Sequence, residues 1–259
     1  QHNPKLNAFC LIDAAGARAA ARESAERWAK GAPLDALDGV PVSIKDLLNL
    51  RGWPTKRGSK LMAEAAPADE DSPSVARLRE AGAIFLGKTT TPEFGWKGVT
   101  DSKLTGVTRN PWNPDLTPGG SSGGAAVAAA MGMGALHLGS DGGGSIRIPA
   151  AFTGIFGLKP SSGRVPIWPY SPFGTLAHVG PMTRTAADAA LMLSIIARPD
   201  ARDPYALPPE EHGLVVSRGL RVRKIAYAAS YADNPVEAEV ESAIAAGNCF
   251  CNAPTISTR

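Results

Sequence analysis

The spacing of apolar and polar positions predicts helices and strands in turn along the chain. Ala, Arg and Glu at helical spacing predict an amphipathic helix over residues 14–30, and Ser72, followed by proline, starts a helix that ends near Gly82. Three further helices are predicted over residues 125–133, 185–197 and 236–246. Short apolar runs predict strands over residues 39–46, 83–86, 135–138, 156–158 and 224–228. Because strands alternate with helices, the sequence predicts an α/β fold, with a mixed β-sheet core flanked by helices.

Two stretches depart from this pattern. Residues 89–124 form a long segment rich in Thr, Gly, Asn and Pro, and loops of this length in compact domains are usually functional. After residue 246 the helical pattern stops without a further strand to pack against it. We therefore expect one domain over residues 1–246. Residues 247–259 are interpreted as an atypical tail, truncated or frame-shifted, with a genuine flexible terminus as the alternative.

Composition and charge narrow the classes of function. Of the 259 residues, 44% are hydrophobic and 20% are charged, which is typical of a globular protein with a sizeable core. The net charge of +3 is small and the basic residues are scattered, so we expect no nucleic-acid partner. No apolar run reaches about 18 residues, so we expect no membrane-spanning helix. The cysteines form neither a disulfide framework nor a metal-ligand pattern, which favours a reducing, cytoplasmic location.

One segment matches the spacing of a phosphate-binding P-loop. Residues 82–89 read G-x-x-x-x-G-K-T, with Lys88 as the motif lysine. A P-loop needs a flexible run of amides between a strand and a helix, whereas residues 83–86 are Ala-Ile-Phe-Leu and belong inside a strand. The Thr-Thr-Pro that follows disfavours an immediate helix. A nucleotide site is therefore the weakest of the hypotheses.

A second segment fits the G-x-S-x-G nucleophile elbow of α/β-hydrolases, with Ser121 as the central serine. That mechanism needs a strand before the serine, and an acid and then a histidine after it. The residues before Ser121 have the composition of a loop. The candidate histidines, none in a recognisable motif, are His137, His178 and His212. A Ser-His esterase is the alternative enzyme hypothesis.

The third glycine-rich segment, residues 139–147, is the most informative. Gly142, Gly143 and Gly144 place three successive backbone N–H groups just before Ser145. Such a nest of amides can bind the oxyanion that forms during acyl transfer. Nucleophile and oxyanion donors would then come from one turn. A triple glycine taken alone is more typical of a tight turn between a strand and a helix.

Lys45 is a candidate base for Ser145. It stands at the end of the predicted strand over residues 39–46. Removal from water lowers the pKa of a lysine, because desolvation disfavours the ammonium form. A neutral lysine can take a proton from serine, and Ser-Lys pairs are an accepted variant of the catalytic triad. Alone, Lys45 would be interpreted as a solvated charge at a strand end.

Taken together, these segments resemble the amidase signature family. The matching segments are residues 39–46 (GVPVSIKD), 118–124 (PGGSSGG), 139–149 (GSDGGGSIRIP), 157–160 (GLKP) and 180–184 (GPMTR). The likeness runs from about residue 4 to about residue 246. The resemblance implies the amidase signature fold, of which this chain would hold the N-terminal and central part, incomplete at both ends.

The resemblance implies a catalytic relay of a lysine, a bridging serine on a cis peptide, and a serine nucleophile. By motif position these are Lys45, Ser121 and Ser145, with Ser122 the second choice for the bridge. The implied oxyanion hole consists of the backbone amides of Gly142, Gly143, Gly144 and Ser145. Asp141 and Arg147 are expected to hold the loop as an ion pair.

The implied activity is hydrolysis of the carbon–nitrogen bond of a small-molecule amide through an acyl-enzyme, with water as the second reactant. The resemblance implies no metal and no organic cofactor. Ile148 and the Gly-Arg-Val-Pro of residues 163–166 depart from the pattern of the glutaminyl-tRNA amidotransferase subunit. They favour a free-standing amidase for aryl, aliphatic or lactam-derived amides. A homodimer is considered as its assembly. The alternative from another class is a non-catalytic subunit or inactive fragment.

Overall fold

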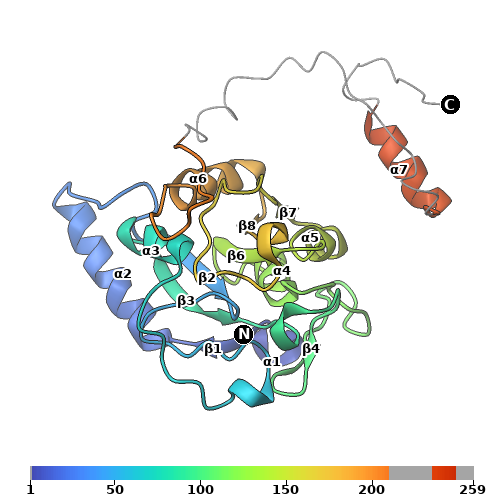
Figure 1. Cartoon of the computed structure of the whole chain (residues 1–259), viewed down its shortest axis with the longest axis horizontal. Coiled ribbons are helices and arrows are strands. Elements are labelled where there is room, and N and C mark those ends of the chain that lie inside the picture. The colour runs from blue at the N-terminus through green and yellow to red at the C-terminus, as the bar shows by residue number, and fades with distance from the viewer. Residues whose placement is uncertain (1, 210–234, 249–259) are drawn as a thin grey trace. The chain divides into compact units, whose positions relative to one another are not determined.

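The computed structural model describes residues 2–209 and 235–248. The chain divides into two compact units, residues 1–213 and 214–259. The first unit is built on a six-stranded sheet of order β1-β3-β2-β6-β8-β7 (Figure 1). Its strands are β1 (Phe9–Ile12), β2 (Pro41–Lys45), β3 (Ile84–Thr89), β6 (Leu136–Asp141), β7 (Phe156–Gly157) and β8 (His178–Thr183). The pairs β2–β3 and β2–β6 are parallel, whereas β1–β3, β6–β8 and β7–β8 are antiparallel, so the sheet is mixed as predicted.

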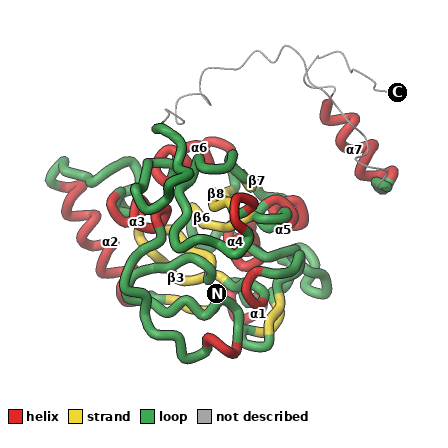
Figure 2. The backbone as a smooth tube through the Cα atoms, in the orientation of Figure 1, coloured by secondary structure: helices red, strands yellow, loops and turns green. Residues whose placement is uncertain are grey.

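Helices surround this sheet, as the tube in Figure 2 shows. Those of the first unit are α1 (Asn3–Leu6), α2 (Ala14–Ala29), α3 (Pro73–Glu80), α4 (Gly123–Ala130), α5 (Arg147–Thr153) and α6 (Ala186–Ile196). Short 3-10 turns are η1 (Lys60–Met62), η2 (Glu93–Gly95) and η3 (Gly174–Leu176), and the hairpin strands are β4 (Asp101–Ser102) and β5 (Gly106–Val107). The described part of the second unit contains α7 (Ala238–Asn248).

Local chemistry fixes where several helices begin. The Asp13 side chain accepts a hydrogen bond from the Gly16 amide at 2.8 Å and caps α2. The Thr185 hydroxyl accepts from the Asp188 amide at 3.1 Å and caps α6. Proline at the first position of α3 has no N–H to leave unsatisfied there.

The two faces of the sheet bury different helices. On one face, apolar side chains of the central strands β2 and β6 pack with α3 and α6. The members of this core from the four elements include Val42, Ile44, Leu136, Leu138, Val75, Leu78, Met192, Ile195 and Ile196. The almost completely buried helix α4 contacts β2, β6 and β8. Because side chains alternate along a strand, residues next to the apolar ones point toward the opposite face.

Most predicted elements are present. The helices predicted over 14–30, 72–82, 125–133, 185–197 and 236–246 correspond to α2, α3, α4, α6 and α7, and the strands over 39–46, 83–86, 135–138 and 156–158 to β2, β3, β6 and β7. The strand predicted over 224–228 and residues 249–259 of the predicted tail lie outside the described residues.

The predicted elements do not include β1, α5 and β8. Strand β8 contains Gly180 and Pro181, which both disfavour strand formation in a local pattern. Its pairing with β6 overrides that preference, since Gly180 lies opposite Gly139 and Pro181 opposite Leu138. Helix α5 has only seven residues, with a proline at the third, which is too short to produce a clear period.

Candidate active site

Lys45 ends β2 and lies inside the protein. Its side chain is fully buried, and its Nζ atom donates to three serine hydroxyls, at 2.7 Å from Ser121 Oγ, 2.8 Å from Ser122 Oγ and 3.0 Å from Ser140 Oγ. Burial disfavours the ammonium form and lowers the pKa of Lys45 to about 7, although the Asp141 carboxylate acts in the opposite direction. A large share of this lysine is therefore neutral near pH 7 and able to accept a proton.

Strand alternation places the lysine there. Val42 and Ile44 belong to the apolar core shared with α3 and α6, so Ser43 and Lys45 point to the opposite face, where α4 begins. Ser43 Oγ is 2.7 Å from Nδ1 of the buried His137 on the neighbouring strand β6. The polar residues of β2 thus form one row, with Lys45 at its end.

Ser121 and Ser122 occupy the turn that enters α4. The Gly120–Ser121 peptide bond is cis, as the family resemblance implies. The Ser122 amide donates to the Ser145 carbonyl at 3.1 Å, and the Ser122 hydroxyl donates to the Ser140 carbonyl at 3.1 Å. Ser122 is therefore committed to backbone groups of the neighbouring segment, whereas Ser121 lines a cavity.

A glycine lets this turn approach the rest of the site. A Cβ atom on Gly120 would lie 2.6 Å from the carbonyl carbon of Val99, which is closer than two carbon atoms can pack. The Thr100 side chain then binds both ends of the turn, donating to the Gly119 carbonyl at 2.8 Å and accepting from the Gly123 amide at 3.1 Å. The turn that carries Ser121 is thus held from outside α4.

Asp141 ends β6 and organises the turn that follows. Its carboxylate accepts from the Gly144 and Ile146 amides at 2.7 and 3.1 Å, and from Nε and Nη2 of Arg147, both at 3.0 Å. Burial raises the pKa of Asp141, but the Arg147 guanidinium and these amides outweigh burial and bring the pKa down to about 2. The expected ion pair between Asp141 and Arg147 is therefore present.

The three glycines of this turn differ in whether they line the cavity beside the site. Gly142, Gly143 and Ser145 line the cavity. Gly144 is buried and its amide already donates to Asp141. The structure therefore does not place the Gly144 amide with the expected oxyanion donors, because the carboxylate that holds the turn uses it.

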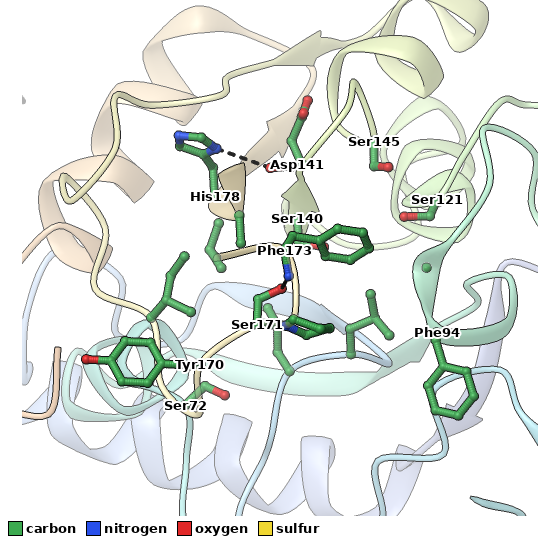
Figure 3. Close-up of a pocket in the computed structure, with 18 of the residues that line it drawn as sticks. Ser72, Phe94, Ser121, Ser140, Asp141, Ser145, Tyr170, Ser171, Phe173 and His178 are labelled. Atoms are coloured by element: carbon green, nitrogen blue, oxygen red, sulfur yellow. Dashed lines mark hydrogen bonds between the residues drawn. The ribbon is translucent and has the colours of Figure 1, made fainter. Parts of the chain in front are cut away.

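The cavity beside these residues has a volume of about 340 Å³. Figure 3 shows Ser145 and Ser121 on neighbouring segments at this cavity, together with Ser140, Asp141 and Phe173. Two loops, residues 94–98 and 166–173, supply the aromatic side chains of its walls, and other segments, including Leu47, Arg57 and residues 72–74, complete them. The Ser145 hydroxyl, the Ser121 hydroxyl next to a buried lysine, and Gly142 and Gly143 thus line one space that a small molecule can enter.

The histidines do not replace the lysine in the described part of the chain. His137 is buried, bound to Ser43, and does not line the cavity; burial lowers its pKa to about 3. His178 lines the cavity, but its Nδ1 atom lies 2.7 Å from the Leu176 carbonyl and 3.3 Å from that of Asp141. His212 lies outside the described residues. Neither His137 nor His178 is hydrogen-bonded to Ser121 or Ser145.

Lys88 of the P-loop pattern is a buried strand residue. It lies in β3, where Nζ forms an ion pair with Asp46 at 3.0 Å and donates to Thr55 Oγ1 at 2.8 Å. Strand β3 runs through the last six residues of the motif, so no loop of amides surrounds a phosphate there. The structure thus excludes the P-loop conformation for this segment.

Ser140 is the site residue that the sequence did not predict as a contact of Lys45. It precedes Asp141 in β6, and its hydroxyl is the third partner of Lys45 Nζ. The only sequence feature that points to Ser140 is its place in the glycine-serine segment of residues 139–149. The contact itself depends on how β2 and β6 pair, which the local sequence does not show.

The described residues also bear on metal binding and on membranes. Among them, no group of three or more His, Cys, Asp or Glu side chains is arranged to hold a metal ion. No helix in residues 2–209 or 235–248 is long and apolar enough to cross a membrane.

Comparison with known proteins agrees with this geometry. The family model described as Amidase matches residues 1–247. A glutamyl-tRNA(Gln) amidotransferase subunit of Myxococcus xanthus is 43% identical over 94% of this chain and 51% of its own length. An acylamidase of Rhodococcus erythropolis is 45% identical over 85% of this chain and 47% of its own length.

Solved structures show the same likeness. The crystal structure of a bacterial aryl acylamidase of the amidase signature family superposes with a TM-score of 0.89 at 36% identity, covering 98% of this chain and 54% of that one. The chain spans about half the length of the curated relatives it matches. The family model, the relatives and the fold agree, and the chain belongs to the amidase signature family.

Proposed function

We propose that this chain hydrolyses amide bonds, with Ser145 as nucleophile, Ser121 as bridge and Lys45 as base. The observation that carries the proposal is the fully buried Lys45, whose Nζ lies 2.7 Å from Ser121 Oγ. Such a lysine can act as a base near neutral pH without a histidine. Residues 1–246 are proposed as the part that belongs to the amidase domain.

The proposed reaction uses these three side chains in turn. Neutral Lys45 takes a proton through the Ser121 hydroxyl while Ser145 Oγ attacks the amide carbonyl carbon. The oxyanion accepts hydrogen bonds from the amides of Gly142, Gly143 and Ser145. The C–N bond then breaks, and the relay returns the proton to the leaving amine. Water attacks the resulting Ser145 ester, which releases the carboxylic acid and restores the serine hydroxyl.

Asp141, Arg147 and Ser122 are proposed as structural supports. Asp141 and Arg147 hold the turn between β6 and α5, in which Ser145 stands. Ser122 connects the Ser121 turn to Ser140 and to Ser145 through its hydroxyl and its amide. These three residues are proposed to position the reacting groups and not to react themselves.

The finer proposal is a free-standing amidase of small-molecule amides. It is supported by Ile148, which lines the cavity and departs from the pattern of the tRNA-dependent subunit. The relatives include both an acylamidase and a component of an amidotransferase. Glutaminase activity that depended on further protein components would contradict this choice.

The test is hydrolysis of small amides and matched esters by four forms of the chain: wild type, Ser145→Ala, Lys45→Met and His178→Ala. We expect Ser145→Ala and Lys45→Met to lose activity by at least about a thousandfold, since each removes an essential member of the relay. His178→Ala should retain most of it. Full activity in Ser145→Ala together with loss in His178→Ala would instead favour a Ser-His esterase. Inactive wild type that is nonetheless folded would favour the non-catalytic fragment.

A further inference from the structure

Two aromatic side chains from separate loops form one wall of the cavity. Trp96 follows η2 and Phe173 precedes η3, and both line the cavity that Ser145 and Ser121 face. Their ring centroids are 5.4 Å apart and their planes are inclined by 15°, which is a stacked arrangement. The wall thus presents flat apolar surface, the kind against which another ring packs well.

The backbone near each ring lies close to a residue of the site. Gly95, next to Trp96, is so near the relay that a Cβ atom on it would lie 3.3 Å from Ser121 Oγ. On the other side, a Cβ atom on Gly142 would lie 3.7 Å from Cγ of Phe173. Trp96 therefore follows a backbone segment next to Ser121, and the Phe173 ring lies beside Gly142.

Trp96 is held in an exposed position. Its side chain is 76% exposed although it is large and apolar, and exposed apolar surface at a cavity is typical of a binding site. The preceding Phe94 has a left-handed backbone conformation with φ of 51°, and its amide donates to the Arg57 carbonyl at 2.8 Å. Left-handed backbone at a non-glycine residue is uncommon and concentrates where function needs a particular geometry.

Two of the charged groups near this wall have partners, while Arg57 also lines the cavity. Lys97, next to Trp96, pairs with Asp101 at 2.6 Å, and Asp141 pairs with Arg147 at 3.0 Å. These charges therefore offer little to an ionised group on a substrate, whereas the uncharged rings remain available to an apolar one.

We infer that Trp96 and Phe173 determine specificity, and that they select amides with an aromatic ring joined directly to the amide group. The inference rests on the proposed function, because it identifies the substrate class of the same site. The ring belongs either to the acyl part, as in benzamide, or to the amine part, as in 4′-nitroacetanilide. Both share the contact with the stacked pair.

The experiment compares kcat/KM for benzamide, 4′-nitroacetanilide and acetamide in wild type, Trp96→Ala, Phe173→Leu and Trp112→Ala. Trp112 is 68% exposed and does not line the cavity, so it is the matched control. We expect Trp96→Ala and Phe173→Leu to lose about tenfold on at least one aromatic amide and less than about threefold on acetamide. If kcat/KM falls more for benzamide, the ring belongs to the acyl part of the substrate; if it falls more for 4′-nitroacetanilide, the ring belongs to the amine part.

Benzamide binding to Ser145→Ala, measured by calorimetry, separates this inference from the proposed function. Tighter binding than acetamide, weakened about tenfold by adding Trp96→Ala, supports the aromatic wall even if turnover is absent. Equal loss on all three amides, or wild type with no preference for aromatic amides in turnover or binding, would overturn the inference. The proposed function would fall separately, through full turnover in Ser145→Ala.

Discussion

At the scale of single residues, the protonation state of Lys45 decides whether its side chain can act as the base that we propose for Ser145. A lysine in water has a pKa near 10.4, so less than about one molecule in a thousand is neutral at pH 7. Burial brings the pKa of Lys45 to about 7, so about half of the molecules carry a neutral Lys45 at pH 7. The three serine hydroxyls around Nζ replace water without adding a negative charge. Desolvation therefore turns a weakly available base into an abundant one.

The pH dependence of the reaction follows from this pKa. Since the base must be neutral, kcat/KM for an amide should rise with pH through about 7 and level off above it. The rate rises with pH because the lysine can accept a proton only after it has lost its own. A pH–rate profile measures it. A limb near pH 10, or a rate that falls as pH rises through 7, would be inconsistent with Lys45 as the base.

Ser121 and Ser122 should differ in the size of their effects. Both hydroxyls bind Lys45, but Ser122 also binds the Ser140 backbone while Ser121 lines the cavity. Ser121→Ala should therefore lower kcat/KM by about a hundredfold to ten-thousandfold, and Ser122→Ala by about tenfold. Steady-state kinetics of the two variants, with circular dichroism as a check on folding, provides the comparison. A larger loss in Ser122→Ala would reassign the bridge to Ser122.

At the scale of elements, the connection from β6 to α5 makes a rigid turn out of a glycine-rich segment. Three consecutive glycines would be expected to cost much conformational entropy on ordering. Asp141 offsets that cost by binding the Gly144 and Ile146 amides and the Arg147 guanidinium. The same contact uses the Gly144 amide, which leaves Gly142 and Gly143 at the cavity.

Asp141→Asn should therefore damage both stability and catalysis. An asparagine cannot accept from all of these donors, and its own NH₂ group would face one of them. We expect the free energy of unfolding to fall by about 1–3 kcal/mol and kcat/KM to fall by about tenfold or more. Asp101→Asn, which removes an exposed ion pair with Lys97, is the control and should change stability by less than about 1 kcal/mol. Chemical denaturation and kinetics test this, and equal effects of the two variants would refute it.

At the scale of the first unit, the sheet carries polar residues through its centre. His137 and Ser43 pair between β6 and β2, and both are fully buried. Burial lowers the pKa of His137 from 6.5 to about 3, mainly by disfavouring the charged ring. Above pH 6.5 the histidine is neutral in both the folded and the unfolded chain.

Acid should therefore destabilise the protein through His137. Between pH 6.5 and about 3 the unfolded chain binds a proton that the folded chain does not, so the free energy of unfolding falls as pH falls. His137→Gln keeps a donor for Ser43 and removes the titration. Denaturation at pH 7 and pH 5 should show a smaller loss in the variant than in wild type, whereas an equal or larger loss in the variant would contradict this pKa.

Much of this architecture could be predicted from local pattern. The strand that ends at Lys45, the helix after Ser122 and the ion pair of Asp141 with Arg147 all lie in segments with clear periods or motifs. The contact of Ser140 with Lys45 could not, because it depends on the pairing of two strands far apart in sequence. The Trp96–Phe173 stack could not either, since it joins two loops without any period. The sequence predicts that the loop of residues 89–124 is functional, but it does not indicate which side chains of the loop reach the cavity.

The most direct test of the account is where an active-site-directed fluorophosphonate reacts. After labelling of the wild-type chain near pH 8, mass spectrometry of proteolytic peptides should locate a single adduct on Ser145. Lys45→Met should slow that labelling by at least about a hundredfold, and His178→Ala should label at close to the wild-type rate. An adduct on Ser121, or labelling that depends on His178 and not on Lys45, would contradict a serine nucleophile at position 145 activated by a buried lysine.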